Sequence, residues 1–197
     1  IFKPNRSKVE FLNINQVNQL SKDPSSKVQD EACPDGLNMN AKPDPPKVVF
    51  MGGGGVDGAI HRKGGAAILD ACKEIRRTQW RGGLPTGKAV LTTAGALPAQ
   101  AVIHTVGPIY KQDRERAPSL LRACVSSSLT LAHTSNLRTI AFPAISTGVY
   151  GYPMREAATL MRDESQQYID THPEAFDEIR FVLFDDRALQ IFQDVWS

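Results

Sequence analysis

Four consecutive glycines, Gly52 to Gly55, are followed after one residue by an acid, Asp57. Backbone without side chains can adopt φ > 0 and can bring its N–H groups close to a phosphate, as glycine-rich loops at helix N-termini do. A carboxylate beside a bound anion is unfavourable unless it accepts hydrogen bonds from sugar hydroxyls or orients a water molecule. The pattern therefore predicts a phosphate-binding loop with a functional acid, and a flexible linker with a chance aspartate is the alternative.

A second loop with similar chemistry, Ile145 to Gly151 (ISTGVYG), lies between an apolar strand and Pro153, a residue favoured in a first helical turn. Backbone N–H groups in such a turn, aided by the helix dipole, can hold a diphosphate. Ser146 and Thr147 add hydroxyl donors, and Gly148 permits close approach. We expect this loop and the glycine run to clamp one diphosphate; a loop that only caps the helix is the alternative.

One aromatic residue and two histidines lie near these motifs. Phe184 ends the last apolar run, where an aromatic ring can stack on a base, and a core phenylalanine is the alternative. His61 either helps to arrange the loop around Asp57 or is structural at a helix start, and we favour the second. His104 lies inside an apolar strand, so we expect it in the core or behind the site.

The elements that must position these residues follow from hydrophobic periodicity. Strands are expected at 9–14, 89–93, 101–106, 139–142 and 179–184, and helices at 66–77 (Leu69 on the buried side), 119–134, from Pro153 onward, and 187–196. Strands that alternate with helices favour an α/β/α sandwich with a largely parallel sheet, in which ligands bind at the carboxyl ends of the strands.

Three blocks, in this order and spacing, resemble the macrodomain family of ADP-ribose-binding α/β modules: MGGGGVDGAIH (51–61), LPAQAVIHTVGP (97–108) and AFPAISTGVYG (141–151). The resemblance runs from about Met51 to Trp196 and is strongest to the MacroD-type members. Those proteins remove ADP-ribose from acidic side chains and deacetylate O-acetyl-ADP-ribose. The resemblance thus implies a three-layer α/β/α macrodomain fold with a mixed, largely parallel central sheet, and a hydrolase.

The resemblance also implies a role for individual residues. Asp57 would be catalytic, orienting water and ribose, Tyr150 would lie against the distal ribose, and Phe184 would stack on adenine. The position at which the family has an aspartate for the adenine amino group falls on Asn13 or a neighbour. The ligand-binding residues expected on this basis are Asn13, Ile14, Gly53, Gly54, Gly55, Val56, Ser146, Thr147, Gly148, Val149, Tyr150 and Phe184.

The chain departs from the family pattern just before the glycines. MacroD-like proteins carry Asn-Ala-Ala-Asn there, and its last asparagine holds the distal ribose, whereas this chain has DPPK at 44–47. Prolines cannot supply the N–H groups of a central strand. Either 37–41 is the displaced strand end with Asn40 as ribose partner, or 48–51 forms the strand and no such asparagine exists. The departure favours the competing function, a non-catalytic ADP-ribose reader.

Composition bounds the remaining possibilities. The 197 residues, 41% hydrophobic and 22% charged, fit a single macrodomain over 1–197 with a polar, proline-rich insertion at about 21–46. A net charge of +2 is too small to indicate a nucleic-acid surface. The three cysteines have no metal-ligand spacing, and no apolar run could span a membrane. We therefore expect an intracellular monomer that binds ADP-ribose and ADP-ribosylated proteins, with no metal, cofactor, nucleic acid or membrane.

Overall fold

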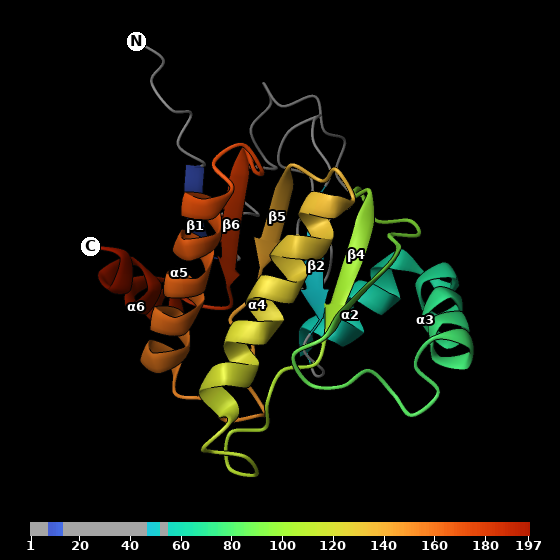
Figure 1. Cartoon of the computed structure of the whole chain (residues 1–197), viewed down its shortest axis with the longest axis horizontal. Helices are drawn as coiled ribbons and strands as arrows, with labels where there is room; N and C mark the ends of the chain where they lie inside the picture. The colour runs from blue at the N-terminus through green and yellow to red at the C-terminus, as the bar shows by residue number, and fades with distance from the viewer. Residues whose placement is uncertain (1–7, 14–46, 52–54) are drawn as a thin grey trace.

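The computed structural model describes residues 8–13, 47–51 and 55–197, and from residue 101 onward its strands and helices alternate (Figure 1). The strands are β1 (Lys8–Asn13), β2 (Lys47–Met51), β3 (Ala89–Thr93), β4 (Ala101–Thr105), β5 (Thr139–Phe142) and β6 (Glu178–Leu183). The helices are α2 (Gly55–Gly64), α3 (Ala66–Thr78), α4 (Ala117–Thr134), α5 (Met154–Thr171) and α6 (Asp186–Trp196). Every expected element is present with ends shifted by at most two residues, and α2 is an addition that the sequence analysis did not predict.

The described strands form one sheet in the order β1-β6-β5-β2-β4-β3. All neighbouring pairs are parallel except β3 with β4, which confirms the mixed, largely parallel sheet. The carboxyl ends of the parallel strands therefore lie along one edge. Asn13 pairs with Leu183 and Met51 with His104 at that edge, and the glycine run, the 143–153 loop and Phe184 all follow strand ends there.

Strand β2 decides between the two alternatives for the segment before the glycines. Lys47–Met51 pairs with both β4 and β5, so this short stretch is the central strand and continues directly into Gly52. The alternative strand end at 37–41, with Asn40, lies outside the described residues. Met51, and not an asparagine, therefore ends the strand.

Helices cover both faces of the sheet. Successive side chains of β4 point to opposite faces and pack in two different core clusters. Ile103 belongs to the larger core cluster, which is built with α4, α5 and α6, whereas Val102 packs in the smaller cluster with residues of α2 and α3. Stacked aromatic rings extend through the larger core, with Phe181 5.7 Å from Phe11 and 5.6 Å from Phe142. Phe142 and Phe181 are fully buried, and burying such a side chain contributes about 1.5–3 kcal/mol, so this layer stabilises the packing of β1, β6 and β5. The three-layer α/β/α fold is confirmed.

Leu69 and most residues of β3 are more exposed than their apolar sequences indicate. Leu69 is 46% exposed because it lies about 100° around α3 from Ile68, which faces the sheet and is fully buried. In β3, only Thr92 is buried, since β3 is the last strand in the order and one of its sides has no neighbour among the described strands. Among the described residues, no helix has the length and hydropathy needed to cross a membrane.

Candidate functional site

The loop between β5 and α5 is fixed by its own hydrogen bonds. The Tyr152 N–H donates to the Ser146 carbonyl at 2.9 Å, and the Gly151 N–H donates to the Gly148 carbonyl at 2.9 Å. Ser146 has φ = 64°, a left-handed conformation that is uncommon for a serine. Strained backbone of this kind persists where the surroundings enforce it and clusters at ligand sites.

Three backbone donors at the tip of this loop are unused. The N–H groups of Gly148, Val149 and Tyr150 donate to no acceptor within the described part of the chain. The tip is open, because Val149 is 90% exposed and a Cβ added to Gly148 would meet no atom within 4 Å. Backbone N–H groups need partners, so this tip is suited to an anion.

The two hydroxyl groups of the loop differ. Thr147 donates its hydroxyl proton to the Ala144 carbonyl at 2.9 Å, so this proton serves the loop itself and is not free for a ligand. The Ser146 Oγ is buried and has no hydrogen-bond partner among the described residues. An unpaired buried hydroxyl costs free energy, so Ser146 is the better candidate for a ligand contact.

Gly107, which the sequence analysis did not single out, supports this loop. It follows β4, and a Cβ placed there would collide with the Ser146 Oγ and lie 2.9 Å from the Ile145 Cγ2. Nearby, the Tyr110 N–H donates to the Tyr150 carbonyl at 3.0 Å. The segment after β4 therefore holds the 145–151 loop in place, and only glycine permits the close approach at position 107.

Asp57 lies in the first turn of α2, where a negative charge is favoured by the helix dipole. Its Oδ1 is buried and has no hydrogen-bond donor among the described residues, and the His61 Nε2 lies 3.6 Å away. A carboxylate oxygen removed from water requires donors, which a sugar hydroxyl or a water molecule can supply. Gly55 is the first residue of α2 and Val56 is half-buried behind it, whereas Gly53 and Gly54 lie outside the described residues.

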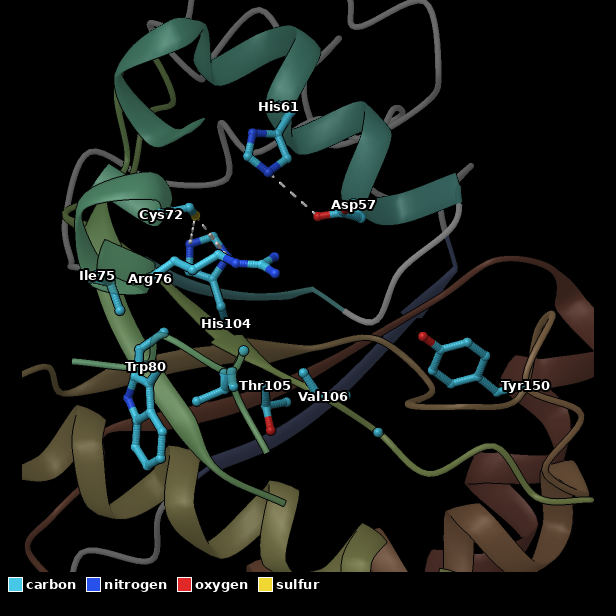
Figure 2. Close-up of a pocket in the computed structure, with 14 residues that line it drawn as sticks. Asp57, His61, Cys72, Ile75, Arg76, Trp80, His104, Thr105, Val106 and Tyr150 are labelled. Carbon is cyan, nitrogen blue, oxygen red and sulfur yellow. Dashed lines mark hydrogen bonds and ion pairs between the residues drawn. The ribbon is translucent and has the colours of Figure 1, made fainter. Parts of the chain in front are cut away.

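Asp57 and Tyr150 line the same pocket, which has a volume of about 440 Å³ (Figure 2). Figure 2 shows α2 contributing Asp57 on one side and the 145–151 loop contributing Tyr150 on another. The structure therefore places Asp57, the acid that follows the glycine run, and the 145–151 loop on one pocket, and the clamp on a diphosphate stays a prediction. The other lining residues are His61, Cys72, Ile75, Arg76, Trp80, Gly83, Leu84, Val90, His104, Thr105, Val106 and Gly107.

His104 lines this pocket as an uncharged side chain. It is 8% exposed, and its Nε2 lies 2.7 Å from the Thr92 Oγ1. Burial, with a smaller contribution from the charge of His61, lowers the pKa of His104 to about 4, so the ring is uncharged at pH 7. His104 is buried, as expected, but it lines the pocket directly instead of lying behind the site. His61 also lines the pocket, with its Nε2 3.6 Å from the Asp57 Oδ1.

Cys72 contacts His104 but is not an activated nucleophile. Its Sγ lies 3.7 Å from each ring nitrogen of His104. Burial, and then the charge of Asp57, raises the pKa of the Cys72 thiol, which therefore stays protonated at neutral pH. Among the described residues, no three His, Cys, Asp or Glu side chains are grouped to hold a metal ion. The chemistry available to the described pocket residues is the activation of water by a carboxylate.

Phe184 follows the last residue of β6 and is 79% exposed, which excludes the core interpretation of this ring. The end of β1 is its neighbour along the sheet edge, because Asn13 pairs with Leu183. Asn13 ends β1 and Phe184 follows β6, so the two are neighbours at this edge, and an adenine contact by either one stays a prediction. Ile14 lies outside the described residues.

Comparisons with known proteins agree with this geometry. The family model described as Macro domain matches residues 47–161. An Enterobacter cloacae protein named O-acetyl-ADP-ribose deacetylase is 48% identical over 144 residues, which cover 73% of this chain and 78% of that protein.

Two solved structures share the fold. The Oceanobacillus iheyensis macrodomain with ADP has a TM-score of 0.72 and 38% identity, covering 77% of this chain and 83% of that one. The Trypanosoma brucei macrodomain in complex with ADP-ribose has a TM-score of 0.66 and 35% identity, covering 77% of this chain and 63% of that one. With the family match over more than half of its length, the chain belongs to the macrodomain family.

Proposed function

We propose that the chain binds ADP-ribose and hydrolyses its esters, both O-acetyl-ADP-ribose and ADP-ribose linked to Asp or Glu side chains of proteins. A relative at 48% identity is named for the first of these activities, and a related structure holds ADP-ribose. The observation that carries the proposal is the buried Oδ1 of Asp57, which has no donor among the described residues and belongs to a carboxylate that lines the pocket with Tyr150.

In the proposed reaction, water adds across the ester and yields the carboxylic acid and free ADP-ribose. The unused N–H groups of Gly148, Val149 and Tyr150 would hold the diphosphate, which places the distal ribose between Tyr150 and Asp57. Asp57 would accept a hydrogen bond from the attacking water or from a ribose hydroxyl and fix its position. His104 is uncharged at pH 7 and would shield the reacting atoms from bulk water.

A reader without catalysis is the second candidate function. The observation that favours it is Lys47, the first residue of β2, because this lysine occupies the position where the MacroD-type pattern has the asparagine that holds the distal ribose. Loss of one ribose contact would weaken the positioning of the ester more than the binding of the diphosphate.

Two assays separate these functions. Isothermal titration measures the binding of ADP-ribose and of AMP, and a turnover assay follows the release of ADP-ribose from its acetyl ester and from a glutamate-modified protein. The hydrolase requires tighter binding of ADP-ribose than of AMP, together with turnover. Binding without turnover supports the reader, and equal affinity for ADP-ribose and AMP refutes the two-loop clamp.

We further propose one macrodomain over 1–197 with an insertion at about 21–46, since the family model begins at residue 47. Its partners would be ADP-ribosylated proteins, which it would meet as a monomer inside the cell, where the free thiols of Cys72 and Cys124 stay reduced.

A further inference from the structure

The pocket continues well past Asp57. In Figure 2, Tyr150 lies at one end and Trp80 at the other, and the guanidinium of Arg76 projects into the space between them. The far end, as we name the part formed by Ile75, Arg76, Trp80, Leu84 and Val90, comes from α3, β3 and the segment between them. The 145–151 loop contributes Tyr150 to the pocket and no residue to the far end, so the free N–H groups of this loop lie apart from it.

The far end combines apolar walls with one cation. Ile75, Leu84, Val90 and the indole of Trp80 supply apolar surface. Arg76 has no ion-pair or hydrogen-bond partner among the described residues, although its neighbours on α3 do: Arg77 pairs with Glu74 at 2.7 Å and Lys73 with Asp70 at 3.4 Å. An unpaired guanidinium beside apolar walls is suited to a carboxylate at the end of a short hydrocarbon chain, which it can hold with two parallel hydrogen bonds.

The position of Arg76 relative to Asp57 indicates which part of an ADP-ribose ester extends toward Arg76. If the distal ribose lies between Tyr150 and Asp57, the ADP half of the ester extends toward the 145–151 loop. The acyl half must then leave Asp57 in another direction, and the continuous pocket leads it to the far end. An acetyl group fills little of a pocket of about 440 Å³, which leaves room for a longer acyl chain.

We propose that the far end binds the acyl group of the ester, and that esters of dicarboxylic acids, such as O-succinyl- and O-glutaryl-ADP-ribose, are preferred substrates. This inference rests on the proposed hydrolase function and names its substrate class. The reaction is the same hydrolysis: water adds across the ester, the bond between the acyl group and the ribose oxygen is replaced by two hydroxyl groups, and ADP-ribose and the dicarboxylic acid are released. No oxidant or reductant takes part.

The test compares kcat/KM for three esters of ADP-ribose: acetyl, pentanoyl and glutaryl. Pentanoyl matches glutaryl in carbon number and lacks its charge, so the ratio of glutaryl to pentanoyl isolates the carboxylate. We expect the wild type to favour glutaryl by roughly tenfold, the factor expected of one additional charge-assisted hydrogen bond at a partly exposed site. Arg76→Gln should bring this ratio close to one, and Arg76→Lys should restore part of it.

Arg77→Gln is the matched control, because Arg77 is the next residue on α3 and its guanidinium pairs with Glu74, away from the pocket lining. It should keep the wild-type ratio. A wild-type ratio of one or less, or an unchanged ratio in Arg76→Gln, would overturn the inference, while turnover of the acetyl ester would leave the proposed function intact. If the wild type cleaves none of the three esters, both fail.

Discussion

Protonation of His104 should destabilise the folded protein as the pH falls from 7 to 4. Burial, and then the charge of His61, lowers the pKa of this ring from 6.5 to about 4, so the unfolded chain takes up a proton near pH 6.5 and the folded chain does so only near pH 4. In that window the unfolded state binds more protons, and stability therefore falls as the pH falls. The shift of about 2.5 pH units, at about 1.36 kcal/mol per unit, corresponds to a loss of about 3 kcal/mol.

Urea unfolding of the wild type and of His104→Gln at several pH values between 7 and 4 measures this loss. The glutamine can still reach Thr92 with a polar group but cannot titrate. Between pH 7 and 4, the free energy of unfolding of His104→Gln should therefore fall by about 3 kcal/mol less than that of the wild type. Only the difference between the two pH slopes matters, which removes any constant cost of the substitution. The same dependence of stability on pH in both proteins would refute a lowered pKa of His104 in the folded protein. A His104 ring that titrates near pH 6.5 by NMR in the folded protein would refute it as well.

Three further substitutions test the binding site. Gly148→Val should abolish most ADP-ribose binding by calorimetry with no loss of melting temperature, because no protein atom lies within 4 Å of the new Cβ, and Gly82→Val, equally open, should bind normally. Phe184→Ala should weaken ADP-ribose by roughly 1–3 kcal/mol and leave ribose 5-phosphate unchanged; an equal loss for both ligands would contradict the stacking role. Gly107→Ala should lower both stability, by roughly 1–3 kcal/mol, and affinity, through its collision with Ser146; wild-type values would refute the supporting role.

Periodicity predicted most of the fold because α4, α5 and α6 each bury one stripe of residues and β6 alternates between buried and half-buried ones. Periodicity did not decide which segment forms the strand before the glycines, since Lys47–Met51 is short and directly follows two prolines. Only its pairing with β4 on one side and β5 on the other identifies it as a central strand. The prediction that Leu69 lies on the buried side of α3 was wrong. Adjacent apolar residues in a helix do not indicate how many of them the neighbouring layer buries.

The site was predictable where its residues lie within one motif. The loop 145–151 and Asp57 could be recognised from glycines, hydroxyls and an acid at close spacing, and the structure places Asp57 and Tyr150 on one pocket. The contacts that join distant segments could not be predicted in this way. Cys72 meets His104 across 32 positions of sequence, and Gly107 supports Ser146, because the sheet brings their elements together.

In the proposed hydrolase, Asp57 positions the water that cleaves an ADP-ribose ester. Single-turnover release of ADP-ribose from its acetyl ester and from a glutamate-modified protein, compared between the wild type and Asp57→Ala, tests it most directly. We expect a fall in rate by a factor of roughly 10²–10⁴, with an intact fold and a smaller loss of ADP-ribose affinity, since the backbone donors of the 145–151 loop remain. Equal rates for the two proteins would contradict the catalytic role of Asp57, and binding without release by the wild type would contradict the hydrolase.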